Sequence, residues 1–71
     1  MKSFVVDVFK TDSKNSITKR RLESETLENA KYLMEVHSQT SDVTRIVVSQ
    51  RVGARFDRLD KKYVWTRDMK S

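Results

Sequence analysis

The stretch VTRIVVSQRV, residues 43–52, decides the fold because it is the strongest strand signal in the chain. More than half of it is β-branched, and β-branched residues favour strands. Because side chains alternate along a strand, its residues fall into two sets: Ile46, Val48 and Val52 face one way, and Arg45, Val47, Ser49 and Arg51 face the other. Gly53 ends the stretch. A strand with one apolar side predicts a second layer that covers that side.

The segment before this strand predicts a helix that can form the second layer. Its apolar residues recur at intervals of three and four, which is the period of a helix: Leu27, Ala30, Leu33, Met34 and His37. Thr26 is the predicted N-cap, because its hydroxyl can accept a hydrogen bond from a free amide of the first turn. Glu25 and Glu28 suit the positive end of the helix dipole. We expect the helix to end near Ser38 or Gln39.

Three more strands are expected on either side of these two elements. Residues 3–10 (SFVVDVFK) alternate as a strand does, and the polar residues 11–16 have turn chemistry. Residues 17–23 (ITKRRLE) therefore return antiparallel to the first strand. Residues 63–67 (YVWTR) predict a fourth strand, whereas residues 54–62 fit an irregular loop, a helical turn or an extension of the hairpin.

The order of these elements predicts a single α+β domain over residues 1–71. It is a two-layer ββαββ arrangement in which one helix packs on a small antiparallel sheet. The apolar residues of the helix should meet four strand residues in the core: Val6, Val8, Ile46 and Val48. A domain of this size buries a small fraction of its surface, so pairing with a second copy would help it. We expect a homodimer, with Tyr32 or the fourth strand as the contact.

Composition excludes several classes of function. The sequence contains no Cys and only one Gly and one His, so it lacks the residues of a disulfide framework, a Cys-rich zinc site or a glycine-rich phosphate loop. His37 has no companion residues at a catalytic or metal-ligating spacing, and we expect it to pack at the end of the helix. The sequence predicts a protein without catalytic activity, cofactor or metal. The apolar runs are too short to span a membrane, and a cytoplasmic location is expected.

Charge is unevenly distributed along the chain. Residues 1–22 hold six Lys or Arg and two Asp, a net charge of +4, and residues 43–71 hold eight against three, a net charge of +5. Residues 23–42, which include the helix, hold one Lys and five acidic residues, a net charge of −4. Such a molecule is expected to present a basic sheet that attracts an anionic partner. Charged side chains on exposed strands also serve as ordinary solubilising groups.

The candidate partner-binding residues are the cations of the strands and their connection, with two aromatic residues: Lys19, Arg20, Arg21, Arg45, Arg51, Arg55, Arg58, Lys61, Lys62, Tyr63, Trp65 and Arg67. Arginine can hold a phosphate or carboxylate through two hydrogen bonds. Tyr63 and Trp65 are two residues apart and share a face of their strand, where unpaired bases could stack on them. Alternatively, these two large side chains complete a small core.

One segment resembles a known class of proteins. Glu25-Thr26-Leu27-Glu28-Asn29-Ala30, followed by Leu33 and by Val43-Thr44-Arg45, is similar to the strand-helix-strand segment of short phage-encoded host-takeover proteins, including inhibitors of bacterial RNA polymerase. The resemblance covers residues 22–48 and carries over no functional residue. It implies a small non-catalytic protein that binds a larger host machine and blocks or redirects it.

Two functions are therefore expected from the sequence. The first is a regulator or inhibitor, of phage or mobile-element origin, that docks its basic sheet and hairpins onto an acidic protein surface or a nucleic-acid channel of a host enzyme. The second is direct RNA or DNA binding through the same surface. A buried Trp65 together with an apolar patch at Tyr32 and Val36 or an open sheet edge would favour protein contact. Exposed Tyr63 and Trp65 would favour nucleic acid.

Overall fold

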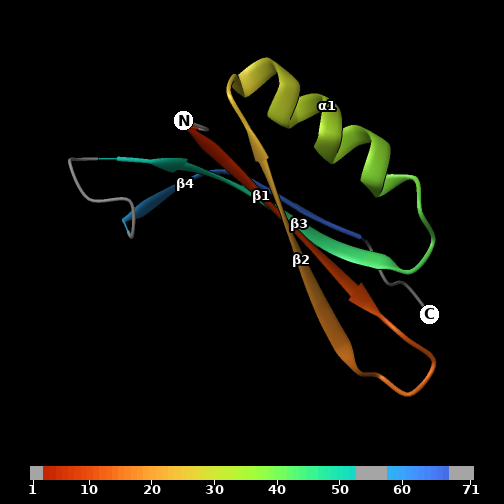
Figure 1. The fold of residues 1–71 in the computed structure, drawn as a ribbon. Helices are drawn as coiled ribbons and strands as arrows, with labels where there is room; N and C mark the ends of the chain where they lie inside the picture. Colours follow the sequence, from red (N-terminus) through yellow and green to blue (C-terminus); the bar gives the residue numbers. More distant parts are fainter. Residues whose placement is uncertain (1–2, 53–57, 68–71) are drawn as a thin grey trace.

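The computed structural model describes residues 3–52 and 58–67, and it shows the expected α+β arrangement (Figure 1). Four strands and one helix follow one another in the order ββαββ, with these bounds: β1 Phe4–Thr11, β2 Ile17–Ser24, α1 Leu27–Ser38, β3 Val43–Arg51 and β4 Leu59–Thr66. The predicted helix and the first three strands match these elements to within one residue at each end. The fourth strand begins earlier than predicted.

The strands form one antiparallel sheet in the order β2-β1-β3-β4. β1 and β3 lie at the centre, and β2 and β4 form the two edges. Val6 on β1 pairs with Leu22 on β2 and with Val48 on β3, so the central residues of one side line up across the sheet. Tyr63 on β4 continues the same row beside Val48.

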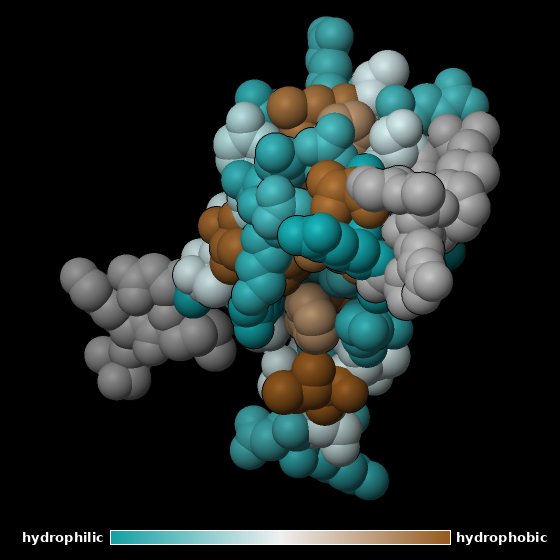
Figure 2. Space-filling model, turned by 90° about the vertical axis from the view of Figure 1, so that its left-hand side faces the viewer, coloured by the Kyte–Doolittle hydropathy of each residue, from teal (hydrophilic) through white to brown (hydrophobic). Residues whose placement is uncertain are grey.

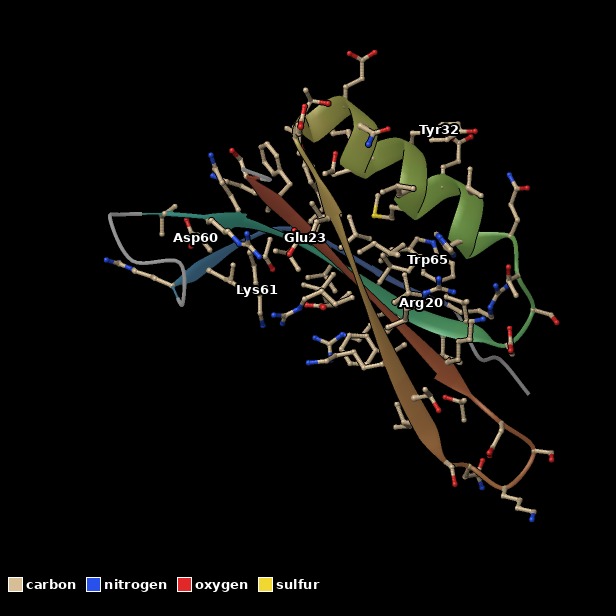
Figure 3. The ribbon with its side chains drawn as sticks, viewed as in Figure 1. Arg20, Glu23, Tyr32, Asp60, Lys61 and Trp65 are labelled. Atoms are coloured by element: carbon tan, nitrogen blue, oxygen red, sulfur yellow. The ribbon has the colours of Figure 1, made fainter. Side chains whose placement is uncertain are left out.

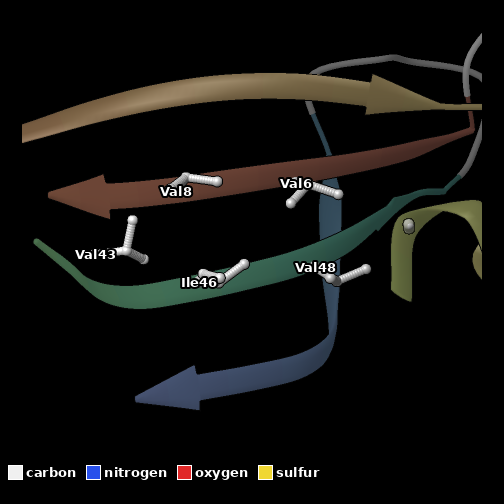
Figure 4. Packing of buried hydrophobic residues seen from close by; sticks show 6 residues of the cluster. Val6, Val8, Val43, Ile46 and Val48 are labelled. Carbon is white, nitrogen blue, oxygen red and sulfur yellow. The ribbon is translucent and has the colours of Figure 1, made fainter. Parts of the chain in front are cut away.

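The core lies between α1 and one face of the sheet (Figure 4). Its buried residues come from β1, α1 and β3: Val6, Val8, Ala30, Val43, Ile46 and Val48. Partly buried residues complete it at the margins: Phe4, Leu22, Leu27, Leu33, Met34 and Trp65. The predicted packing of the helix on Val6, Val8, Ile46 and Val48 is confirmed. We call this side of the sheet the helix side.

Local hydrogen bonds fix the ends of α1. Thr26 has an extended backbone, and its side chain accepts a hydrogen bond from the amide of Asn29 at 3.1 Å, which confirms it as the N-cap. The Asn29 side chain also donates to the hydroxyl of Ser24 at 3.0 Å, which links the helix start to the end of β2. At the other end, Gln39 is the C-cap and its amide donates to the carbonyl of Val36.

The β1–β2 turn uses the expected polar chemistry. One oxygen of Asp12 accepts hydrogen bonds from the amides of Lys14 and Ser16, both at 2.9 Å. Asn15 adopts a left-handed backbone with φ of 64°, a conformation that Asn tolerates better than most residues. These bonds close the turn on the Thr11–Ile17 pair, which fixes the register of the whole hairpin.

β4 corrects the prediction for the last third of the chain. The strand starts at Leu59, so Leu59 to Lys62 extend the hairpin, while residues 54–57 lie outside the described residues. The pairing shifts between Val48 and Ser49, which leaves Lys62 as an extra residue in β4. This irregularity places Tyr63 opposite Val48 and Lys61 opposite Ser49.

Candidate binding face

The face of the sheet opposite α1, named here the open face, carries side chains in three rows. Cross-strand pairing defines the rows: Lys19, Phe9, Arg45 and Thr66; then Arg21, Asp7, Val47 and Val64; then Glu23, Val5, Ser49 and Lys61. Arg51 extends the same side of β3 beyond Ser49. α1 lies on the other side of the sheet, so among the described elements no helix covers these rows (Figure 1).

The centre of the open face is buried even though α1 does not reach it. Val5 is fully buried, and Ser49, Val47 and Asp7 are exposed by 4%, 7% and 8%. Arginine can lay its aliphatic stem over apolar residues while its charged group stays in water. Nε of Arg21 donates to Oδ1 of Asp7 at 3.0 Å on this face. The face is therefore a packed surface with a charged cover.

A second ion pair crosses β1 near one end of the sheet. Nη2 of Arg51 on β3 donates to Oε1 of Glu23 on β2 at 2.8 Å, and the side chains are 20% and 43% exposed. β1 lies between these two strands, and Val5 pairs with Glu23, so this ion pair passes over β1 near Val5. The two ion pairs balance the charges of Arg21 and Arg51.

The remaining cations of the open face are Lys19, Arg45 and Lys61, and they form no ion pair within residues 3–52 and 58–67. All three are exposed. The guanidinium of Arg45 lies 5.7 Å from the centre of the Phe9 ring, which holds it over the aromatic side chain. The open face thus presents a surplus of positive charge at its margins, around a buried centre.

Tyr63 and Trp65 do not contribute to this basic surface. They pair with Val48 and Ile46 and therefore lie on the helix side of β4. Trp65 packs against the core beneath α1 (Figure 3), and Tyr63 lies under Lys31, whose Nζ is 4.7 Å from the ring centre. The two aromatics share a face, as predicted, but it is opposite the open face. Of the two roles considered for Trp65, packing in the core is the one observed.

Arg67 makes structural contacts on the helix side. Its Nε donates to the carbonyl of Val43 at 2.9 Å, and its Nη2 donates to those of Ser38 and Thr40 at 2.7 and 2.9 Å. Its guanidinium also lies 5.2 Å from the ring centre of Trp65. These contacts tie the end of β4 to the loop between α1 and β3. The Nε and Nη2 donors of Arg67 are therefore occupied within the chain.

The other candidate cations are divided among several places. Arg20 pairs with Val8 and is exposed on the helix side, although its neighbours Lys19 and Arg21 lie on the open face. Lys62 occupies the irregularity of β4, and Arg58 is exposed just before that strand. Arg55 lies outside the described residues. The single basic surface expected from the sequence is thus only partly formed.

The outer surface of α1 is acidic and carries two exposed apolar side chains. Glu25, Glu28 and Glu35 are exposed on this side of the molecule. Tyr32 and Val36 are 61% and 42% exposed, and Tyr32 projects from the outer side of α1 (Figure 3). In the view of Figure 2, apolar side chains form separate islands among hydrophilic ones. On the side of the molecule that Figure 2 shows, the exposed apolar side chains are therefore scattered.

Phe9 is the residue of the open face that sequence reasoning missed. Its position on the same side of β1 as Val5 and Asp7 was evident from the alternation, but its neighbours were not. The contact with Arg45 depends on the pairing of β1 with β3, two strands that are far apart in sequence. The β1–β2 hairpin brings Phe9 beside Lys19, but only the β1–β3 pairing adds Arg45 to them.

Comparison with known proteins finds no matching family model, no matching curated protein and no matching solved structure. Within the described residues, no cluster of three or more His, Cys, Asp or Glu could hold a metal ion. The one helix described is too short and too polar to cross a membrane. The candidate site therefore rests on the geometry of the open face.

Proposed function

We propose that this protein is a non-catalytic binding protein that docks its open face onto an anionic site of a larger protein. The observation that carries the proposal is the placement of Lys19, Arg45 and Lys61, which are exposed on the open face without a carboxylate partner among the described residues. Carboxylates of a partner would supply the missing counter-charges. Complementary charge of this kind steers encounter and fixes the orientation of docking.

The packing of the aromatics supports a protein partner. Trp65 belongs to the core margin, and Tyr63 lies beneath Lys31, so neither offers a stacking platform beside the basic residues. Tyr32 and Val36 are exposed, as expected for protein contact. The resemblance to phage-encoded proteins implies that the bound protein is a host enzyme that becomes blocked or redirected. This is a further part of the proposal, and identifying the bound protein tests it.

Direct binding of nucleic acid is the second candidate, and one specific arrangement favours it. Lys19, Phe9 and Arg45 lie side by side in one row of the open face, so two cations flank an aromatic ring. Cations that bind phosphates beside an aromatic ring that can stack on a base are the usual features of single-strand binding surfaces. Phe9 is half-buried beneath Arg45, and a base would have to displace or stack on that guanidinium.

A capture experiment with matched variants tests the proposed face. Bacterial lysate, treated or untreated with nuclease, is passed over the immobilised protein, the variant Lys19→Glu/Arg45→Glu, and the control Arg20→Glu/Lys31→Glu. Both variants lower the net charge equally, but the control changes exposed cations of the helix side. We expect the open-face variant to lose the captured protein, and the control to retain it in nuclease-treated lysate. Equal capture by the two variants would contradict the proposal.

Salt and nuclease separate the two candidates. If every captured partner disappears after nuclease treatment, nucleic acid is the ligand. In that case, affinity for a labelled single-stranded oligonucleotide should fall log-linearly with salt, with a slope of about −0.7 for each phosphate neutralised. A protein partner that survives nuclease treatment should instead show mainly a slower association rate at high salt.

A further inference from the structure

The two edges of the sheet differ in how well they are protected from pairing with another strand. β2 carries three consecutive cations, Lys19, Arg20 and Arg21, and charged residues of this kind discourage pairing between edges. β4 is charged only in its first half, at Asp60, Lys61 and Lys62. Its second half, Tyr63–Thr66, carries no charged side chain. The unprotected part of the sheet margin is therefore the end of β4.

Backbone hydrogen bonds show which groups of β4 point away from the sheet. The amide of Arg67 donates to the carbonyl of Thr44 at 3.0 Å, so these two residues form a bonded pair. Bonded and non-bonded pairs alternate along antiparallel strands. Every second residue back from Arg67 therefore bonds to β3, and these residues are Trp65 and Tyr63. The amides and carbonyls of Val64 and Thr66, which lie between them, point outward from the sheet. On β2, the same alternation starts from the bonded pair of Asp12 and Ser16. It places the backbone amides and carbonyls of Lys19 and Arg21 on the outward side of β2.

The outward backbone groups of Val64 and Thr66 lie on an edge whose side chains are uncharged and whose end is fixed by hydrogen bonds. Val64 is 50% exposed, beside the exposed ring of Tyr63. The contacts of Arg67 with the carbonyls of Ser38, Thr40 and Val43 fix the end of the strand. A strand that is already ordered loses little conformational freedom when it pairs, so its backbone groups are available at low entropic cost.

We propose that β4 is the interface of a homodimer, in which two copies pair through residues Val64–Thr66 across a two-fold axis centred on Trp65, so that Val64 of one copy faces Thr66 of the other. The axis makes the two β4 strands antiparallel, so the outward groups of Val64 and Thr66 can bond to those of the second copy. Within this segment no like charges oppose each other, because it contains none. The same pairing at β2 would bring Lys19, Arg20 and Arg21 against their own copies. A second copy therefore fits β4 and is repelled at β2.

Pairing through β4 determines how the two copies are arranged, whereas a contact through Tyr32 would not join the two sheets. Pairing at β4 joins the two sheets into one, with both α1 helices on the same side. The two open faces then lie next to each other on the opposite side. The proposal is independent of the binding partner of the open face, since Val64 and Thr66 take part through their backbone.

Amide hydrogen exchange at several protein concentrations tests this interface directly. We expect the amides of Val64 and Thr66 to exchange at least about tenfold more slowly at about 1 mM than at about 10 μM, because mass action populates the dimer. The outward amides of Lys19 and Arg21 serve as an internal control and should show no concentration dependence. Exchange rates at Val64 and Thr66 that do not change with concentration, or slowing at Lys19 and Arg21 instead, would overturn the proposal.

Sedimentation of matched variants provides a second, independent measurement. Val64→Lys introduces a charge into the unprotected edge, and Tyr32→Lys introduces the same charge on α1. We expect the wild type and Tyr32→Lys to sediment as dimers, and Val64→Lys as a monomer with an unchanged circular dichroism spectrum. A third variant, Val64→Pro, removes the outward amide and should also be monomeric, since proline is tolerated at an edge whose N–H faces solvent. A monomeric wild type, or dimeric Val64→Lys, would refute the assignment.

Discussion

The two faces of the sheet bury their central residues by different means. On the helix side, Val48 is fully buried under the apolar residues of α1. On the open face, Val5 is equally buried, yet the cover there includes the ion pairs of Arg21 and Arg51. Burial alone therefore does not distinguish a structural core from a binding surface. The covering side chains distinguish the two, because a charged side chain can exchange its ion-pair partner within the protein for a charged group of a binding partner.

The largest effect is expected from a cavity in the core of the helix side. Ile46 is fully buried and pairs with both Val8 and Trp65. Ile46→Ala should lower the free energy of unfolding by about 2–5 kcal/mol, because it removes buried contacts and leaves a cavity that α1 cannot fill. Thermal unfolding measured by circular dichroism checks this. A loss below about 1 kcal/mol would show that the two layers are not packed as described.

Two arginines sharpen the comparison. Arg67 gives its donors to three carbonyls on the helix side, whereas Arg45 stacks on Phe9 at the open face. Arg67→Ala should cost about 1.5–3 kcal/mol because it removes charged hydrogen bonds to backbone groups. Arg45→Ala should change stability by less than about 0.5 kcal/mol. Chemical denaturation of both variants measures the difference, and equal losses would mean that Arg45 also has a structural role.

A matched pair of valines compares the two kinds of cover directly. Val48→Ala should cost about 2–3 kcal/mol, from roughly 0.8 kcal/mol per methylene-sized group plus a cavity under α1. Val5→Ala should cost about 1 kcal/mol less, because the charged side chains over it can settle into the space. The midpoints of urea unfolding give both values. If Val5→Ala lowered the free energy of unfolding more than Val48→Ala, the charged side chains over Val5 would be unable to move into the space.

A small effect is also expected from the ion pair across β1. Glu23→Gln removes the carboxylate that holds Arg51, and its side chain is 43% exposed. Such a partly exposed pair contributes below about 1 kcal/mol, and salt screens it. The stability difference from wild type should therefore shrink further in high salt. A difference that persists unchanged in about 1 M salt would mean that the pair is effectively buried.

Local patterns predicted the elements well. The helix period, the Thr26 cap and the Asp12 turn depend on neighbours in sequence, and all three are confirmed. Residues Leu59 to Lys62 carry no clear strand signal because Asp and Lys have little preference for strands. They become a strand through pairing with Ser49, Gln50 and Arg51 of β3, which local propensity does not encode.

The candidate site was harder to predict because it depends on pairing between distant strands. Alternation alone separates Arg20 from Lys19 and Arg21, and it could have removed Arg20 from the basic surface. The side taken by Tyr63 and Trp65 could not be deduced in this way. It follows from the register of β4 on β3, which changes at the extra residue Lys62. The contacts of Arg67 likewise required the position of the loop after α1.

The strand order also has a consequence for how the chain folds as it is made. β1 is synthesised first and can form its hairpin with β2 at once, because the two are joined by a short turn. Its other edge stays unpaired until β3 is synthesised after α1. Bringing β3 back to β1 closes a loop that contains β2 and α1, and closing a long loop is slow. Until then, Val6 and Val8 lie on a strand with one unpaired edge. Nascent chains that end before residue 43 therefore expose an edge that the complete fold hides, and they are the species most prone to misassembly.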